Sequence, residues 1–446
     1  MMKKFLVLCL AAAMMLSIAA LPATAEEQVT ITFSNWDGGN TLDAYNAAIA
    51  KFESIHPNIK VEMINIPSEY DTKITAMIAG GTPPDIAILE SGTIAFTLAE
   101  EGKVYNLYEL QEADPTYAEH PILESLAYNW APDKRLGYAL GPQMVCLYYS
   151  RPALEAAGIT PADSYENAWT WDEFVANAKL LTLDGQGRNA NDPAFDRNDV
   201  VQWGTTAPSW YATGYSVLMG SMGADYTTED GSALAIFDEP GMAEAVQMIA
   251  DLIYVHQVAP SPSESASMPG IVDAFATGAY AMSIGGHWSN LSLMAEGIDY
   301  DLMPVPKVDK PFTRLMGGCL SILSSTKHPK EAWEFYKFMA DPQNTISMID
   351  NGLWLPMSTE WYTDPELIAK WAQTDAHPEH YVPVVVEGML KYAEPLFQFY
   401  VKNFNKMNAI IAPALDTVWL GESTAADALA SVKDQVVPLY EGRYDK

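Results

Sequence analysis

Residues 70–90, YDTKITAMIAGGTPPDIAILE, hold a helix, a stop signal and a strand in that order, and this order decides the fold. The pattern predicts a helix over Tyr70–Ala79. The glycines and prolines of residues 80–84 end that helix, because both residue types interrupt helical backbone. Asp85–Leu89 is short and apolar, as a buried strand is. The stretch therefore predicts one half of a strand–helix–strand unit.

The same alternation continues on both sides of this stretch. The pattern predicts strands over Val29–Phe33 and Ile59–Ile66, with a helix over Thr41–Ile55 between them, and a further helix over Thr93–Glu101. Strands and helices that alternate at this spacing predict an α/β fold with a mainly parallel sheet.

Four side chains follow two of these strands. Ligands of open α/β sheets bind beyond the carboxyl ends of the strands. We therefore expect a binding edge at Trp36 and Asp37, after the first strand, and at Glu90 and Ser91, after the third.

A second α/β block begins near Gln143. Its helix after Trp169 carries a capping box, with Thr170 as N-cap and Glu173 three residues later. The remaining predicted elements are strands over Val145–Ser150, Val201–Thr206, Ala281–Ile284 and Cys319–Leu323, and helices over Met242–Tyr254, Ile271–Phe275, Lys330–Met339 and Pro342–Met348, with a largely helical tail over Tyr381–Tyr440.

Three motifs in this order resemble one known family. They are residues 70–86, with Y-x-x-K followed by A-G-G-T-P-P-D-I; residues 147–174, with L-Y-Y-S, A-G-I and T-W-D-E-F; and residues 275–288, with F-A-T-G-A-Y-A-M and G-H-W. The chain resembles the extracellular solute-binding proteins of ABC importers, family 1, whose best-known members bind malto-oligosaccharides and other sugars. The resemblance runs from about Ile31 to Pro356.

The resemblance implies a two-lobed periplasmic-binding-protein fold, type II-like, with the ligand in the cleft between the lobes. It implies hinge closure over a sugar, delivery to ABC permease subunits, and no enzymatic activity. We expect one lobe to hold residues 26–141 and 285–326 and the other residues 142–284 and 327–446. The matching hinges fall near Pro142–Val145, Ala281–Gly285 and Ser324–His328.

A sugar site needs aromatic faces for C–H groups and fixed carboxylates or amides for hydroxyls. Trp288, after the Gly285-Gly286 turn, is the strongest candidate, and His287 beside it is expected to be a surface or supporting residue. The rival interpretation is packing for Trp36, Gln143, Trp210, Tyr211 and Trp354, a plain turn for Gly318, and a helix-start role for Asp71. The candidate ligand-binding residues are Trp36, Asp37, Tyr70, Asp71, Glu90, Ser91, Gln143, Trp210, Tyr211, Trp288, Gly318 and Trp354.

The first 25 residues predict a signal peptide. Lys3 and Lys4 precede an apolar run over Phe5–Leu21, and Ala23-Thr24-Ala25 fits a cleavage site. Cys9 lies near the start of that run rather than at its end, so we expect no lipid anchor. The expected location is periplasmic or otherwise extracytoplasmic, with cleavage after Ala25.

The composition excludes some partners. The chain has 25 basic and 57 acidic residues and a formal charge of −32, which repels nucleic acid. We expect a monomer that needs no cofactor. We also expect no metal site, because the Asp184–Asp199 loop lacks EF-hand spacing. Cys146 and Cys319 are expected to be buried thiols, with a single disulfide bridge as the alternative.

Two other functions stay open at this point. One is a secreted glycoside hydrolase, which needs two carboxylates across a sugar bond. A chain this acidic always contains a pair that looks suitable, so the presence of such a pair is not specific. The sequence has no G-x-S-x-G, phosphate-loop or H-E-x-x-H motif. A binder of another solute, such as a peptide, polyamine or amino acid, is the second alternative.

Overall fold

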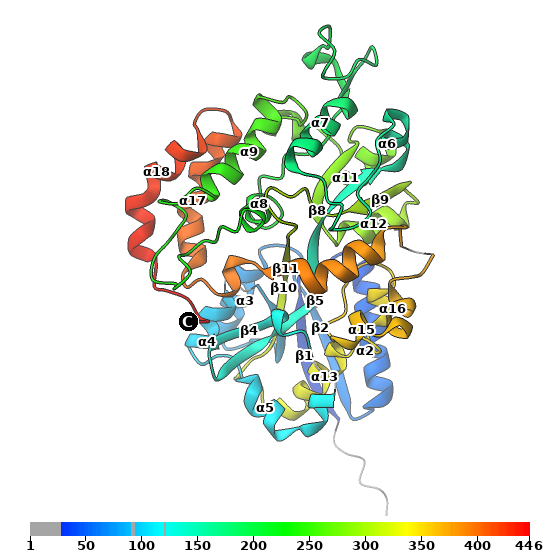
Figure 1. Ribbon diagram of the computed structural model, residues 1–446. Coiled ribbons are helices and arrows are strands. Elements are labelled where there is room, and N and C mark those ends of the chain that lie inside the picture. Colours follow the sequence, from blue (N-terminus) through cyan, green and yellow to red (C-terminus); the bar gives the residue numbers. More distant parts are fainter. Residues whose placement is uncertain (1–27, 91–93, 120–121, 376) are drawn as a thin grey trace, which may run out of the picture.

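The computed structural model describes residues 28–90, 94–119, 122–375 and 377–446. The expected signal peptide and Ser91 lie outside these residues. Figure 1 shows two bodies of strands and helices, one above the other, joined by strands that run between them. The two-lobed α/β architecture that the sequence predicted is confirmed.

The first lobe is built on three parallel strands. β1 (Val29–Asn35) pairs with β2 (Ile59–Asn65) from Val29↔Ile59 to Asn35↔Asn65, and with β3 (Ile86–Leu89). Ile31 and Phe33 on β1 are fully buried. The helices of this region are α2 (Asn40–Ile55), α3 (Tyr70–Ala79), α4 (Phe96–Glu100) and α5 (Leu107–Ala113).

The expectation of a mainly parallel sheet is wrong beyond these three strands. The sheet has the order β2-β1-β3-β10-β5-β4, with β4 (Ala127–Ala131), β5 (Lys134–Ser150) and β10 (Thr313–Ile322). β10 is antiparallel to both β3 and β5, and β5 is antiparallel to β4. The reason is topological, since β10 enters from a distant part of the chain and not through a strand–helix–strand crossover.

β5 is the element that joins the two lobes. Its first half pairs with β4, whereas Val145–Ser150 pairs with β8 (Met282–Gly286) and β9 (Tyr300–Met303). The sequence predicted only this second half as strand. Every residue from Arg135 to Tyr149 is buried, so the strand forms the core of the junction.

Two contacts bear on the expected lobe boundaries, which stay a prediction. β9 pairs with the same half of β5 as β8 does, so the chain stays in the second lobe at Ala281–Gly285. Helix α13 (Pro329–Ala340) packs on the first lobe, with the Phe335 ring 5.4 Å from that of Phe33. These contacts favour β5 and β10 as the crossing segments.

The second lobe is mostly helical around β8 and β9. The predicted capping box of α7 (Trp171–Leu181) is present, because the Thr170 hydroxyl accepts from the Glu173 N–H and Glu173 accepts from the Thr170 N–H. The expected strand at Val201–Thr206 shortens to β7, which pairs with β6. The other elements are α6 (Arg151–Ala157), β6 (Leu183–Asp184), β7 (Val200–Gln202), α8 (Tyr215–Ser221), α9 (Met242–Tyr254), α10 (Pro262–Ser265), α11 (Ile271–Thr277) and α12 (Ser289–Ala295).

The C-terminal region contributes short turns near the cleft and a helical pair on the second lobe. Residues 382–386 and 388–392 are π-helical and lead into β11 (Ala393–Pro395), which pairs with β10. The helices are α14 (Ile346–Ile349), α15 (Glu360–Thr363), α16 (Pro365–Trp371), α17 (Phe404–Trp419) and α18 (Ala425–Val436). Short 3-10 turns occupy Pro115–Glu119, Glu124–Leu126, Arg197–Asp199, Phe397–Phe399 and Val437–Leu439.

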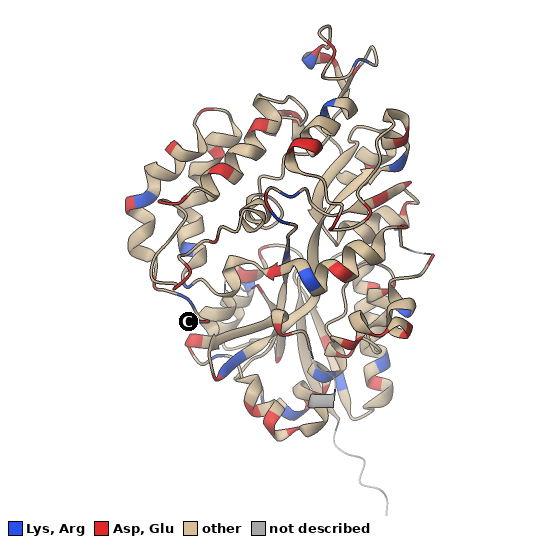
Figure 2. Ribbon diagram, in the orientation of Figure 1, with Lys and Arg blue, Asp and Glu red and all other residues tan. Residues whose placement is uncertain are grey.

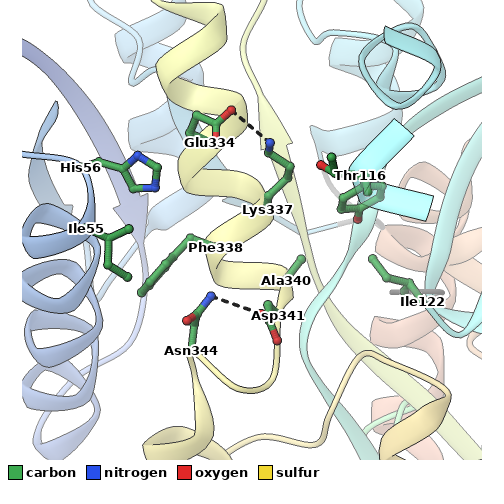
Figure 3. Close-up of a pocket in the computed structure, with 11 residues that line it drawn as sticks. Ile55, His56, Thr116, Ile122, Glu334, Lys337, Phe338, Ala340, Asp341 and Asn344 are labelled. Atoms are coloured by element: carbon green, nitrogen blue, oxygen red, sulfur yellow. Dashed lines mark hydrogen bonds and ion pairs between the residues drawn. The ribbon is translucent and has the colours of Figure 1, made fainter. Parts of the chain in front are cut away.

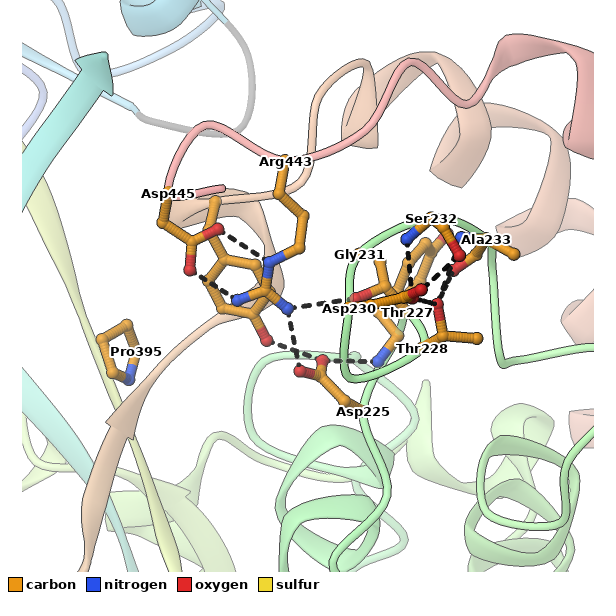
Figure 4. Close-up of polar contacts among 12 residues, drawn as sticks. Asp225, Thr227, Thr228, Asp230, Gly231, Ser232, Ala233, Pro395, Arg443 and Asp445 are labelled. Atoms are coloured by element: carbon orange, nitrogen blue, oxygen red, sulfur yellow. Dashed lines mark hydrogen bonds and ion pairs between the residues drawn. The ribbon is translucent and has the colours of Figure 1, made fainter. Parts of the chain in front are cut away.

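The last residues form a strap between the lobes (Figures 1 and 4). Arg443 forms an ion pair with Asp225 of the second lobe, and its guanidinium lies 3.9 Å over the Tyr400 ring. The next residue, Tyr444, stacks on Phe96 of α4 with ring centroids 4.2 Å apart. Residues 443–444 therefore touch both lobes.

The two cysteines of the described chain do not form a disulfide bridge. Cys146 and Cys319 are free and buried, so the bridge is excluded, and burial raises the pKa of Cys146 to about 12.

In the described residues no helix is both long and apolar enough to cross a membrane. The same residues hold no group of three or more His, Cys, Asp or Glu side chains placed to bind a metal. Figure 2 shows acidic residues on the helices of both lobes.

Candidate functional site

A cavity of about 360 Å³ lies between the lobes. Its volume falls within the range of roughly 300–1,000 Å³ that ligand pockets occupy. Both lobes and both crossing strands contribute to its wall. The lining residues are Trp36, Asp37, Tyr45, Ile88, Glu90, Leu140, Gly141, Gln143, Trp210, Trp288, Met316, Gly317, Gly318, Leu353, Trp354, Leu396 and Gln398.

Most of the candidate residues meet at this cavity. Those that line it are Trp36, Asp37, Glu90, Gln143, Trp210, Trp288, Gly318 and Trp354. Tyr70 and Asp71 line a neighbouring hollow of about 370 Å³, which shares Trp36 and Glu90 with the cavity. The two hollows are therefore adjacent.

Tyr211 is the candidate that the structure places elsewhere. Its ring packs 5.2 Å from that of Phe404, and its hydroxyl donates a hydrogen bond to the side-chain oxygen of Gln398. Gln398 lines the cavity, whereas Tyr211 lies behind it. Tyr211 therefore reaches the cavity wall only through its contact with Gln398.

The two tryptophans of the second lobe are partly exposed. Trp210 is 47% exposed and Trp288 is 39% exposed, and their rings lie 6.2 Å apart at 56°. An exposed indole in a cavity wall can stack on an apolar ligand face. The pair therefore forms an aromatic wall on one side of the cleft.

The tryptophans of the opposite side are fixed by other rings. Trp36 meets Tyr70 edge-on at 5.2 Å and 82°, and the Tyr70 hydroxyl is 2.8 Å from that of Ser34. Trp354 meets Tyr45 edge-on at 5.4 Å and 75°. These edge-to-face contacts hold both indoles in one orientation.

His287 supports the aromatic wall from inside the lobe. It is fully buried, so the expectation of a surface residue is wrong and the supporting role is the one that fits. Its Nε2 lies 2.6 Å from the Tyr381 hydroxyl, and its backbone N–H donates to the Met144 carbonyl at 2.8 Å. Burial lowers the pKa of His287 to about 3. A neutral imidazole therefore anchors the turn that carries Trp288.

Carboxylates line the cleft on the first-lobe side. The Tyr45 hydroxyl donates to Asp37 at 2.8 Å. Burial raises the pKa of Asp37, and this hydrogen bond opposes the rise. Burial also raises the pKa of Glu90, and the nearby Asp71 carboxylate adds to that effect. Within the described part of the chain, no lysine or arginine lines either hollow. This side of the cleft therefore offers hydrogen-bond acceptors.

Gln143 connects two segments at the floor of the cavity. Its Nε2 donates to the Leu353 carbonyl at 2.8 Å and to the Gly141 carbonyl at 3.3 Å. Its Oε1 is buried and has no hydrogen-bond partner among the described residues. The amide thus ties β5 to the segment that carries Trp354.

Sequence reasoning missed several residues of this wall. Tyr45 fell on the buried face of a predicted helix, a pattern that indicates packing alone. Gln398 lies in a tail that was expected to be helical, where no local signal distinguishes it. The apolar residues that were missed are Ile88, Leu140, Met316, Leu353 and Leu396.

A second cavity lies on the far part of the first lobe, beside α2 and α13 (Figure 3). It measures about 310 Å³ and includes Ile55, Phe338 and Lys337. Lys337 forms ion pairs with Asp114 at 2.6 Å and Glu334 at 3.0 Å. None of the described residues that line it is a tryptophan, and its cation is already paired. We therefore place the candidate site in the interlobe cavity.

Comparison with known proteins identifies one family. The family described as bacterial extracellular solute-binding protein matches residues 38–346. The multiple sugar-binding protein of Streptococcus mutans is 23% identical over 333 residues, which cover 70% of this chain and 71% of that protein.

Solved structures share the fold at low sequence identity. An ABC substrate-binding protein from Listeria monocytogenes, in complex with cycloalternan, superposes with a TM-score of 0.76 at 22% identity, covering 92% of this chain and 98% of the other. The maltose-bound MalE3 of T. maritima gives 0.72 at 20% identity, covering 92% and 99%.

Proposed function

Because the chain belongs to the bacterial extracellular solute-binding proteins, we propose that it captures a sugar or oligosaccharide in the interlobe cavity and passes it to the permease of an ABC importer. The observation that carries this proposal is the division of the cavity wall. Partly exposed tryptophan side chains line one side, and carboxylates line the other, and no lysine or arginine of the described chain lines either hollow. A sugar ring presents both an apolar C–H face and hydroxyl donors.

The binding chemistry follows from this division. Trp210 and Trp288 stack on the apolar face of a sugar ring, and Asp37 and Glu90 accept hydrogen bonds from its hydroxyls. Hydrogen bonds to ionised acceptors are roughly twice as strong as neutral ones. Closure of the lobes removes the remaining water, which strengthens both interactions.

The relatives support a sugar as the ligand. The similar Streptococcus mutans protein is named as a sugar binder, and the two structural neighbours hold cycloalternan and maltose. We also propose the finer parts of this role: export with cleavage after Ala25, a periplasmic or otherwise extracytoplasmic location, a monomeric state, no lipid anchor, and binding without cofactor or catalysis.

A thermal-shift screen tests the proposal. Purified protein is heated with panels of mono- and oligosaccharides, amino acids, peptides and polyamines. A ligand at 100 times its Kd stabilises the fold by about 2.7 kcal/mol, so a true ligand raises the Tm clearly. We expect only sugars to do so. A shift with polyamines or amino acids alone contradicts the proposal, and shorter sugars released into the supernatant indicate a hydrolase.

Trp288→Ala tests the aromatic wall. Loss of one stacking face should weaken sugar binding by about 1–3 kcal/mol, because both contact area and ring stacking disappear. Titration calorimetry gives the affinity. Trp130→Ala is the matched control, since Trp130 lies on β4 and lines neither hollow. An unchanged affinity in Trp288→Ala removes this residue from the site.

A further inference from the structure

Three tryptophans of the cavity lie directly on glycines. A β-carbon at position 286 would stand 2.0 Å from Cζ3 of Trp288, and one at position 318 would stand 2.1 Å from Cη2 of Trp36. At position 141 it would stand 2.4 Å from Nε1 of Trp354. These distances are far inside van der Waals contact, so each indole fills the space that a side chain would take.

The backbone separates these glycines into two kinds. Gly141 has a φ of +60°, in the left-handed region, so its backbone alone favours glycine. Gly286 and Gly318 are not in that region, and their backbone admits any residue. Glycine at 286 and 318 is therefore explained by the indole ring that lies on each.

We propose that Gly286 and Gly318 are positioning residues that set the ligand specificity of the cleft, because each seats a tryptophan against the wall and so fixes the width left for a sugar. This inference rests on the function proposed above. Both tryptophans line the cavity from opposite sides, Trp288 from the second lobe and Trp36 from the first. Their depth in the wall determines how thick a ligand fits between them.

Trp288 shows the effect most directly. The six-membered part of its indole lies against Gly286, yet the side chain is still 39% exposed. All three atoms nearest to the missing β-carbon belong to this ring. An added methyl group must therefore push the indole off the wall, toward the cavity or the cleft mouth. At Gly318 the methyl group also meets Cγ2 of Ile88 at 2.4 Å, so two lining residues move.

The displaced ring occupies volume that the ligand uses. A larger or branched sugar needs more of that volume than a single ring does. Gly286→Ala should therefore lower the affinity for oligosaccharides more than the affinity for the corresponding monosaccharide. A general loss of stability lowers both equally, so the ratio of the two affinities is the diagnostic quantity.

The experiment compares Gly286→Ala with Gly285→Ala. The two glycines are adjacent on β8, but a β-carbon at 285 would meet nothing closer than 3.8 Å. Calorimetry with a mono- and an oligosaccharide should show a loss of at least about fivefold in affinity for the oligosaccharide in Gly286→Ala, which equals about 1 kcal/mol of binding free energy. Gly285→Ala should change it by less than about twofold. Equal changes in the two variants overturn the proposal.

A double-mutant cycle tests whether the glycine acts through the ring. In a Trp288→Ala background the indole is gone, so Gly286→Ala should have no further effect on affinity. A loss of the same size in both backgrounds shows that Gly286 acts in another way and overturns the proposal.

A ligand-free measurement separates this inference from the function on which it rests. Acrylamide quenching of tryptophan fluorescence should change in Gly286→Ala and stay unchanged when Gly286→Ala is added to Trp288→Ala. If no sugar binds the wild-type chain, the proposed function fails. The quenching measurement then still tests whether Gly286 positions the Trp288 ring. Should Gly286→Ala fold poorly, the pair Gly318→Ala and Gly318→Ala/Trp36→Phe replaces it, with partial recovery of the wild-type melting temperature expected in the double variant.

Discussion

At the scale of single residues, Asp37 shows how the site prepares an acceptor. Its carboxylate is partly buried, which raises its pKa and favours the neutral acid, but the hydrogen bond from the Tyr45 hydroxyl at 2.8 Å stabilises the charged form. The ionised form is the better acceptor for a sugar hydroxyl. Under the proposed function, Tyr45 on α2 therefore contributes to sugar binding through Asp37.

This arrangement makes sugar affinity depend on pH. Affinity should fall as the pH drops through the pKa of Asp37, because protonation removes an ionised acceptor. Tyr45→Phe removes the group that lowers this pKa, so the midpoint of the loss should move to higher pH. Calorimetry between pH 4 and pH 8 gives both midpoints. Asp43→Asn, on the same helix but outside the cavity, is the control; a midpoint that Tyr45→Phe leaves in place contradicts the role of Asp37.

His287 gives stability a separate pH dependence. Burial lowers its pKa to about 3, whereas an unfolded histidine titrates near 6.5, so below that pH the unfolded chain binds a proton that the folded chain does not. Stability is unaffected above about pH 6.5 and falls between there and about pH 3, by at most about 1.4 kcal/mol per pH unit.

Urea unfolding at pH 7.5 and pH 5 measures this effect. His287→Gln keeps a polar group toward Tyr381 but cannot titrate, so it should lose less stability between the two pH values than the wild type. Identical losses show that His287 does not account for the acid sensitivity.

At the scale of elements, the strap of residues 443–444 links the loop at Asp225 to α4. Figure 4 shows the Arg443 side of this link. The Arg443 side chain is only 9% exposed and also donates to Thr227 at 3.0 Å and to both carboxylate oxygens of Asp445. Its contacts thus hold the end of the chain across the junction.

Removal of this guanidinium should destabilise the protein. Arg443→Ala is expected to cost about 1.5–3 kcal/mol, the range for hydrogen bonds to charged groups. Denaturant unfolding measures it, and Lys446→Ala, at an exposed position, is the control. If both variants unfold at the wild-type midpoint, the strap does not bind the lobes together.

Local pattern predicted many elements but not their partners. The bounds of α3 and α9 coincide with the predicted helices, because apolar spacing and stop signals are local. The first half of β5 was missed because Gly137, Gly141 and Pro142 argue against a strand. The antiparallel position of β10 could not be predicted, since pairing over such a distance leaves no local trace.

Some residues of the candidate site could be predicted from the sequence, and others could not. The strand-end rule brought Trp36, Asp37 and Glu90 to the cavity, because strand ends share one edge of the sheet. Tyr45 was missed because its place on the buried face of a helix indicated packing alone. Gln398 was missed because its position depends on how the C-terminal segment folds back to the cleft. The contacts of Gly286 and Gly318 with indole rings could not be predicted from the sequence, because they depend on the three-dimensional positions of those rings.

At the scale of the whole molecule, the cavity belongs to neither lobe alone. Asp37 and Glu90 come from the first lobe, Trp210 and Trp288 from the second, and β5 and β10 form the floor between them. A ligand that contacts both walls stabilises the closed arrangement by its differential affinity for it. Ligand binding and lobe closure are therefore thermodynamically coupled.

Titration calorimetry of the purified chain with a panel of mono- and oligosaccharides tests the central claim most directly. We expect saturable binding of at least one sugar at one site per chain, with weaker binding in Trp288→Ala and unaltered ligand recovered afterwards. Absence of heat with every sugar, together with saturable binding of an amino acid, peptide or polyamine, would contradict it.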